Sequence, residues 1–194
     1  DGGHRQFILV QLPESIDPKS EAYKHGFSNI SEISKERIRK AALKYKNISD
    51  QDQDLGFRVF KCDESNLKDI YIEPKHLIQE DLLKYVDNIK DDRTDLDLLF
   101  DCMLKWGVQL SEPITKTKID ECTIYNINEG NLVACFSRNI SEAAIAAITE
   151  MNPLRVVFRD NSFNEASNKM NLFEIFKQKC FWSDEEVYMN IKVI

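Results

Sequence analysis

The pattern of apolar and polar positions predicts a strand, a helix and a second strand in residues 132–163. The first five of these residues are all apolar, which is typical of a strand that is covered on both faces. Ser141 is a suitable helix N-cap, and Pro153 ends the helix. The apolar face of this helix is formed by Ala144, Ala147, Ile148 and Met151. Because residues 153–159 return to the sheet beside the first strand, we expect a right-handed βαβ unit.

A predicted hairpin leads into this unit. Residues 121–127 and 131–136 are strand-like, and the short turn between them places Gly130 at the expected left-handed position. The antiparallel hairpin and the parallel βαβ unit share a strand, so the pattern predicts a mixed sheet.

Helices are predicted before and after the sheet strands. Thr94 or Asp95 caps a helix that Gly107 ends, and Ser162 with Glu165 matches a capping box for another. The first of these helices has an apolar face formed by Leu96, Leu99, Phe100 and Met103. The second has an apolar stripe formed by Phe163, Ala166, Met170 and Phe173, running towards Phe176. The last eight residues alternate, which predicts a final strand, antiparallel or at a sheet edge.

The N-terminal part reads as strand, helix, strand. Residues 7–12 and 56–62 are the strand candidates, and residues 31–45 form the helix between them. The apolar face of the helix consists of Ile38, Ala41, Ala42 and Tyr45. Its remaining surface carries Lys35, Arg37, Arg39, Lys40 and Lys44. These cations can contact phosphates, although a solvated helix face is the commoner explanation.

Residues 63–93 have a weaker pattern, in which one or two helices are suggested by Leu77, Leu82, Leu83 and Val86. We therefore predict an α/β protein with two parts. Residues 1–62 form half of a Rossmann-like sheet, and residues 63–194 form an α/β domain with a mixed sheet.

Charge is distributed unevenly over the two parts. Residues 1–60 carry 10 Lys and Arg against 9 Asp and Glu, and residues 61–194 carry 16 against 24. The acidic C-terminal part is a poor candidate for the main contact with nucleic acid, because it repels phosphates. No segment is apolar for long enough to span a bilayer, and the five widely spaced cysteines include Cys102 and Cys135 within apolar runs. These features indicate a cytoplasmic protein with buried, reduced thiols.

The sequence holds no self-sufficient active site. His4, His25 and His76 lie far apart without other ligands at metal-binding spacing, and no glycine-rich phosphate loop or nucleophile elbow occurs. Arg159 and Asp160 follow a buried strand, where α/β sheets often place functional groups. An ion pair or a helix cap is the commoner role of such a pair. We therefore assign no catalytic residue and no metal ligand.

Five blocks of the sequence, in order, resemble the C-terminal part of the modification (Mod) subunit of type III restriction-modification systems. The blocks are DGGHRQFILVQLPE, SEISKERIRKA, DLGFRVFKCDESN, DLDLLFDCMLKWG and NPLRVVFRDNSF. That subunit is an S-adenosylmethionine-dependent DNA adenine N6-methyltransferase. Its catalytic DPPY motif, target-recognition domain and F-x-G-x-G cofactor loop precede the matching region. The resemblance and the absence of an initiator Met together suggest a piece of a longer protein, inactive by itself.

The resemblance also implies a place for the cofactor. Residues 1–62 would be an incomplete methyltransferase half, with residues 7–12 as its second strand. Related enzymes typically end this strand in an acidic residue that holds the ribose of S-adenosylmethionine. This chain has Gln11 at the matching position and Glu14 three residues later, so these two residues are the cofactor-binding candidates. Gln11 departs from the family pattern because it carries no charge.

By the same resemblance, residues 63–194 correspond to a domain associated with assembly. The implied partners are a second modification subunit, the restriction (helicase and nuclease) subunit, and DNA bound through the preceding domains. The alternative is a stand-alone α/β interaction or dimerisation module without a catalytic role.

Overall fold

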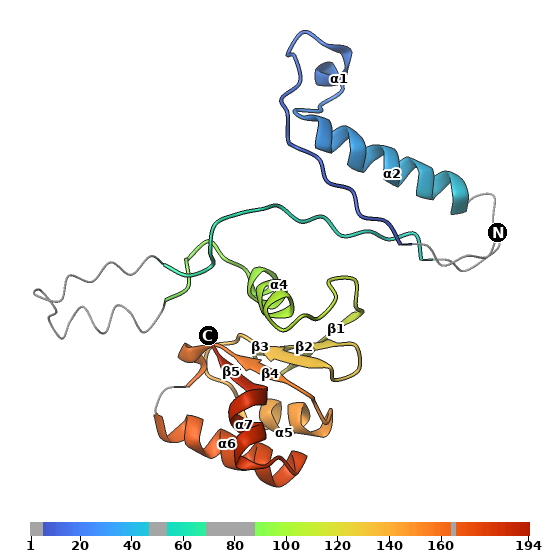
Figure 1. Cartoon of the computed structure of the whole chain (residues 1–194). Helices are drawn as coiled ribbons and strands as arrows, with labels where there is room; N and C mark the ends of the chain where they lie inside the picture. The colour runs from blue at the N-terminus through green and yellow to red at the C-terminus, as the bar shows by residue number, and fades with distance from the viewer. Residues whose placement is uncertain (1–5, 47–53, 69–87, 164–165) are drawn as a thin grey trace, which may run out of the picture. The chain divides into compact units, whose positions relative to one another are not determined.

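The structure is a computed structural model of the whole chain and describes residues 6–46, 54–68, 88–163 and 166–194. It divides into a first unit, Asp1–Phe60, and a second unit, Lys61–Ile194, and each is described by itself (Figure 1).

The second unit is built on a five-stranded sheet, which is mixed as predicted. Its strands are β1 (Ile114–Ile119), β2 (Cys122–Ile127), β3 (Leu132–Cys135), β4 (Val156–Phe158) and β5 (Ile191–Val193). They lie in the order β1-β2-β3-β4-β5, which is also their order along the chain. β1, β2 and β3 form an antiparallel meander, whereas β4 and β5 run parallel to β3.

The predicted βαβ unit is confirmed. Between the parallel strands β3 and β4 lies helix α5 (Glu142–Glu150). The Ser141 hydroxyl accepts a hydrogen bond of 3.1 Å from the Ala144 amide, as expected of an N-cap. Every residue of β3 and β4 is buried, because helices cover both faces of this strand pair.

The hairpin between β2 and β3 is also confirmed, and its turn contains more left-handed residues than the sequence suggested. Asn128 and Glu129 have φ angles of 47° and 53°, so they are left-handed as well as Gly130, whose φ is 101°. A side chain at Gly130 would bring its Cβ to 3.0 Å from the Met151 carbonyl oxygen. Glycine is therefore required there for space as well as for backbone conformation.

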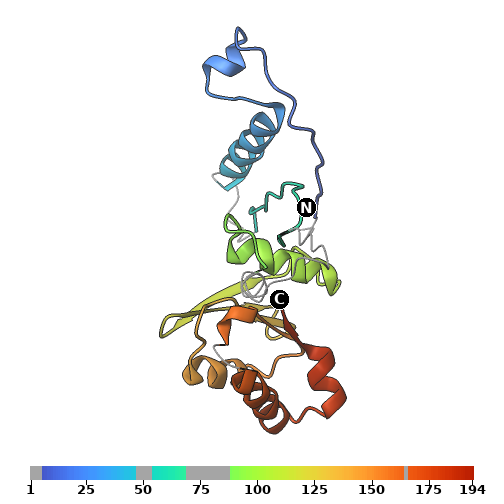
Figure 2. The same cartoon turned by 90° about the vertical axis from the view of Figure 1, so that its left-hand side faces the viewer.

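Helices cover the two faces of the sheet in separate layers (Figures 1 and 2). α4 (Asp95–Lys105) lies on one face, and α5, α6 (Ala166–Cys180) and α7 (Asp184–Asn190) lie on the other. Neighbouring strand residues alternate between the two cores: Val133 and Val156 pack towards α5–α7, and Ala134 and Val157 towards α4. This period of two is the pleat of a sheet that is buried on both faces.

α4 begins and ends as its sequence predicts. Thr94 and Asp97 form a capping box, in which the Thr94 amide donates to Asp97 at 2.7 Å. At the other end Gly107 has a φ of 67°, and the Val108 amide donates to the Met103 carbonyl at 2.8 Å. The predicted apolar face is right in part. Its buried residues are Leu98, Leu99, Cys102 and Met103, whereas Leu96 is 46% exposed.

The predicted C-terminal strand is wrong over most of its length. Ser183 and Glu186 form a capping box that starts α7, and only β5 continues as a strand. The alternation of apolar and polar residues in this segment suggested a strand. The segment instead forms a short helix in which Val187 is buried, whereas Tyr188 and Met189 are exposed. The prediction of an edge position is correct, and the pairing with β4 is parallel.

Two other predictions for the second unit need correction. Residues 114–119 form β1, which the sequence did not predict, since their inward and outward positions do not alternate in polarity. In α6, Leu172 and Phe176 are the fully buried residues, whereas Met170 is 70% exposed. The Ser162 hydroxyl donates to the Ser137 carbonyl at 2.7 Å instead of capping α6. Glu165 and the predicted helices around Leu77 to Val86 lie outside the described residues.

The first unit contains helices α1 (Glu21–Lys24) and α2 (Ile30–Lys46), of which α2 confirms the predicted helix. The strands predicted at residues 7–12 and 56–62 are not formed in this chain. Ile8 and Val10 are 91% and 92% exposed, and none of the described residues of this unit is buried. Strands need neighbouring strands to pair with, and in the described residues neither segment is paired into a sheet.

The α4 capping box generates a prediction for stability. Thr94→Ala removes the hydroxyl that accepts from the Asp97 amide, so the free energy of unfolding should fall by about 0.5–2 kcal/mol. Thr94→Ser retains the hydroxyl and should lose much less. Denaturant unfolding of the three proteins measures this, and equal stabilities of Thr94→Ala and the unchanged chain would contradict the role of the cap.

The absence of buried residues in the first unit predicts local instability. We expect amides of α2 to exchange with solvent at a lower opening free energy than those of β2 and β3, because little packing opposes their opening. Native-state hydrogen exchange measures both sets in one experiment. Equally slow exchange in α2 and in the sheet would mean that the first unit is held as firmly as the second.

Candidate functional site

The two cofactor candidates lie on one exposed segment of the first unit. The Gln11 side-chain amide donates to the neighbouring Leu12 carbonyl at 3.1 Å. The Glu14 carbonyl accepts from the Ile30 amide at 3.1 Å, at the first residue of α2, while the Glu14 side chain is exposed. Both side chains are therefore accessible, and Glu14 is fixed through its backbone at the start of a helix.

Hydrogen bonds around Glu32 fix this junction with α2. Its carboxylate accepts from the Ser28 amide at 2.8 Å and from the Ser28 hydroxyl at 3.0 Å, and these bonds lower the pKa of Glu32. In return, the Asn29 side chain accepts from the Glu32 amide at 3.0 Å. Ser15 forms an isolated bridge with Asn29, which closes the loop that contains α1. The segment that carries the cofactor candidates is thus attached to α2 by its backbone.

α2 carries a row of exposed cations. Arg39 and Lys40 lie 3.8 Å from the same Glu36 carboxylate, and the Arg39 guanidinium lies 5.8 Å from the centre of the Phe57 ring. Such exposed pairs contribute little to stability and leave the cations accessible. The side chains of Arg37 and Lys44 are also exposed. The helix can present positive charge to phosphates, although a solvated face is the commoner explanation.

The carboxyl ends of β3 and β4 are closed by structural hydrogen bonds. The Ser137 hydroxyl accepts from the Thr123 amide at 2.9 Å, and the Asp160 amide donates to the Ile194 carbonyl at 2.7 Å. The Asp160 carboxylate forms an ion pair with Lys169, so the structural role predicted for Asp160 is confirmed. The polar groups at this sheet edge are used in binding the chain to itself.

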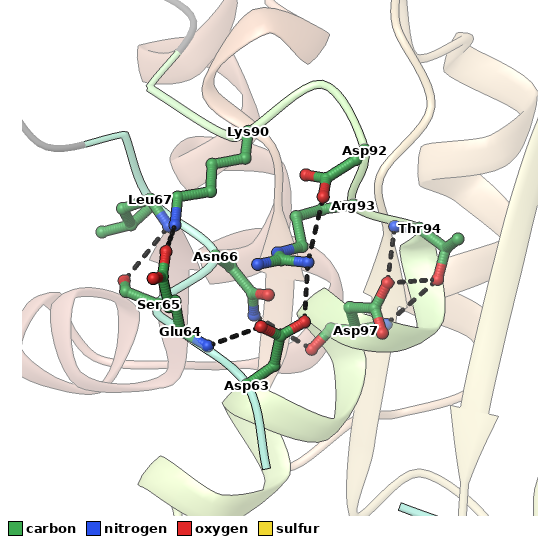
Figure 3. A network of polar contacts seen from close by, with 10 residues as sticks. All are labelled: Asp63, Glu64, Ser65, Asn66, Leu67, Lys90, Asp92, Arg93, Thr94 and Asp97. Carbon is green, nitrogen blue, oxygen red and sulfur yellow. Dashed lines mark hydrogen bonds and ion pairs between the residues drawn. The ribbon is translucent and has the colours of Figure 1, made fainter. Parts of the chain in front are cut away.

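A polar network near the start of α4 was not predicted from the sequence (Figure 3). We call it the polar clasp: it joins residues 63–68 to residues 88–97. Its backbone core is the bridge between Leu67 and Ile89, with the Lys90 amide donating to the Asn66 carbonyl at 2.9 Å. The Asn66 side chain also donates to the Asp97 carbonyl in α4 at 3.2 Å. The clasp therefore attaches residues 63–68 to the start of α4.

Charges reinforce the polar clasp. Arg93, whose side chain is only 11% exposed, binds Asp63 at 3.1 Å and Asp92 at 3.3 Å. The Glu64 amide first, and then the Arg93 charge, lower the pKa of Asp63. Lys90 binds Glu64 at 2.9 Å. The sequence signal for these ion pairs is the presence of opposite charges in residues 61–68 and 90–97. Such charges are too common in sequences to predict which residues pair.

The two thiols that the sequence predicts to be buried offer no nucleophile. Cys102 and Cys135 are buried as predicted, and burial raises the pKa of each to about 11. Since the thiolate is the reactive form, both are inert at neutral pH. Among the described residues, no three His, Cys, Asp or Glu side chains are placed to hold a metal ion. None of the helices in the described ranges is long and apolar enough to cross a membrane.

Comparison with known proteins gives a consistent relationship. The type III restriction-modification enzyme EcoP15I Mod subunit of Escherichia coli is 28% identical over 185 residues, which is 89% of this chain and 26% of that protein. The EcoPI Mod subunit of Escherichia phage P1 is 27% identical over 181 residues, or 87% of this chain and 26% of that protein. The StyLTI Mod subunit of Salmonella typhimurium is 39% identical over 62 residues, 31% of this chain and 10% of that protein.

No family model matches the chain. The chain spans about a quarter of the length of the two relatives that it matches most extensively. Over most of its own length, this chain is homologous to the Mod subunits of type III restriction-modification enzymes.

Proposed function

We propose that this chain forms part of an S-adenosylmethionine-dependent DNA adenine N6-methyltransferase, the modification subunit of a type III restriction-modification system. The observation that carries the proposal is the match to two Mod subunits over 87–89% of the chain. The subunit would act in the cytoplasm. The chain by itself would be inactive, because a methyltransferase must hold a flipped adenine against its cofactor and this sequence has no motif for either task.

The first unit would belong to the cofactor-binding fold. Its exposed apolar residues are the physical support for this assignment: Phe7, Ile8, Leu9, Val10 and Leu12 are 57–92% exposed. A run of apolar side chains that is this exposed is unusual on the surface of a folded soluble protein. Neighbouring strands of a methyltransferase sheet would cover it. Gln11 and Glu14 would then lie where the ribose of S-adenosylmethionine binds.

The second unit would serve assembly, with a second modification subunit and the restriction subunit as partners. It has a complete core on both faces of its sheet, so it folds without help from the cofactor-binding part. Among its described residues, the polar groups at the sheet edge and in the polar clasp mainly bind one another. This closed network also supports the alternative function, an interaction module without a catalytic role.

A chimaeric subunit tests the cofactor role. In it, this chain replaces the matching part of the EcoP15I Mod subunit, and S-adenosylmethionine binding is measured by calorimetry. We expect the chimaera to bind and the chain alone not to bind. Loss of a hydrogen bond from the neutral Gln11 should cost about 0.5–1.5 kcal/mol, and loss of one from the charged Glu14 about 1.5–3 kcal/mol. The larger loss among Gln11→Ala and Glu14→Ala identifies the side chain that holds the ribose.

Glu21→Ala is the matched control, since it removes an exposed carboxylate from α1 in the same loop. It should leave cofactor affinity unchanged. If Gln11→Ala and Glu14→Ala also leave it unchanged, neither residue belongs to the cofactor site. If the chimaera folds but does not bind S-adenosylmethionine, the assignment of the first unit to the cofactor fold is wrong and the interaction module is preferred.

DNA binding by the chain alone should be weak and independent of sequence. We expect Arg37→Ala and Lys44→Ala on α2 to lower the salt dependence of duplex binding, because each phosphate contact releases counterions. Lys118→Ala on β1, in the acidic second unit, is the control and should change nothing. Fluorescence anisotropy at several salt concentrations measures this. Sequence-selective binding that survives ~0.2 M salt would reveal a recognition element elsewhere in the chain.

A further inference from the structure

The two sides of the polar clasp are anchored very differently. On one side, Ile89 is 1% exposed and belongs to the core that α4 shares with the sheet. On the other side, residues 63–68, which we call the strap, contain no buried residue, and Leu67 is 37% exposed. Burial of apolar surface is the main stabilising term in a fold, and the strap has almost none. Its attachment therefore depends on polar contacts.

Two backbone hydrogen bonds hold the strap in an antiparallel register. The Lys68 amide donates to the Asn88 carbonyl at 2.7 Å, and the Lys90 amide donates to the Asn66 carbonyl at 2.9 Å. A two-stranded ribbon is marginally stable in water even when it has more bonds than these. Side chains must therefore supply much of the remaining attachment.

Opposite charges supply this attachment. Two of the ion pairs that cross the clasp end on exposed carboxylates, since Glu64 is 82% and Asp91 is 91% exposed. Dissolved salt screens exposed pairs, so the attachment weakens as ionic strength rises. The three ion pairs that cross from the strap to its partner segment are Asp63 with Arg93 at 3.1 Å, Glu64 with Lys90 at 2.9 Å and Lys68 with Asp91 at 3.2 Å.

Arg93 contributes both an attraction and a cost. Its guanidinium binds Asp63 and Asp92 (Figure 3), and because its side chain is only 11% exposed, salt screens it less than the outer pairs. Its Nε atom is buried and has no hydrogen-bond partner among the residues that the structure describes. A buried polar atom without a partner costs free energy until water reaches it. The same side chain therefore attracts the strap and makes its attachment costly.

We propose that the strap is a detachable link, which leaves the second unit when its charges are screened or removed while the core of that unit stays folded. The strap lies just after the boundary at Phe60 between the two units. Detachment adds up to about 20 Å of free chain to the connection between them. The clasp thus sets the length of free chain between the cofactor-binding part and the assembly part. Those two roles rest on the proposed function, whereas the detachment itself does not.

Native-state hydrogen exchange of the full 194-residue chain tests the proposal. The Lys68 and Lys90 amides report the strap, and the Val133 amide, which donates to the Arg155 carbonyl at 2.9 Å, reports the sheet. Between about 0.01 M and 1 M salt the screening length falls from about 30 Å to about 3 Å. Over this range we expect the two strap amides to exchange about threefold to tenfold faster relative to the Val133 amide.

Substitutions separate the effect of charge from that of shape. Arg93→Gln removes the charge of the least exposed pair and should accelerate the two strap amides on the order of tenfold. Glu64→Lys should also accelerate them, and the further change Lys90→Glu restores an opposite pair, so the double variant should regain protection. Lys105→Gln is the matched control: it breaks an ion pair of 2.8 Å with Asp101 within α4 and should change neither set of amides.

Three results overturn the proposal. Strap amides that exchange as slowly as the Val133 amide at every salt concentration make the strap an integral part of the fold. Exchange that responds neither to salt nor to Arg93→Gln means that contacts other than charge hold the strap. Equal acceleration of the Val133 amide in Arg93→Gln means that the clasp opens only when the whole unit unfolds. Binding of S-adenosylmethionine to the chimaera tests the methyltransferase proposal separately, so either proposal can fail alone.

Discussion

The parallel pair β3 and β4 must be covered on both faces, and this requirement determines the arrangement of the second unit. All seven residues of the two strands are buried, so apolar helices are needed above and below. α4 covers one face of the sheet with Leu99 and Met103, and α6 covers the other face with Leu172 and Phe176. The Thr94 cap of α4 matters because it fixes where this helix begins over the sheet. The polar clasp then secures the start of α4.

The first unit lacks a comparable constraint. Its longest helix, α2, buries no residue, and within the described residues no strand lies beside the apolar segment at residues 7–12. A backbone hydrogen bond joins Glu14 to Ile30. The two units thus differ in packing: the second has a buried apolar core on each face of its sheet, whereas none of the described residues of the first is buried. Homology to the Mod subunits supplies a reason for the difference, because those proteins are about four times as long as the matched segment.

Local signals in the sequence were enough for elements whose determinants lie within a few residues. The Ser141 and Thr94 caps, the glycine stop of α4 and the left-handed turn at Gly130 were all predicted, since each depends on adjacent backbone groups. Elements that depend on distant partners were not. β1 consists mainly of exposed residues, so apolar and polar positions do not alternate along it. The sequence of α7 alternates like a strand, although the segment is a helix whose buried residue is Val187.

In the candidate site, too, features that depend on distant residues could not be predicted from local sequence patterns. Gln11 and Glu14 were chosen through resemblance, and no local pattern in the sequence indicates the role proposed for them. The polar clasp lies wholly within the chain but joins residues about 30 positions apart, which no local pattern reveals. Burial of Cys102 and Cys135 was predictable because both lie within apolar runs.

The edges of the sheet decide how this protein avoids uncontrolled association. β1 is a six-residue outer strand whose exposed positions include Lys116 and Lys118, and β5 at the opposite edge is only three residues long. A strand from another chain pairs less readily with an edge strand that carries lysine or that is very short. Continuous growth into fibrils is therefore disfavoured at both edges of the sheet.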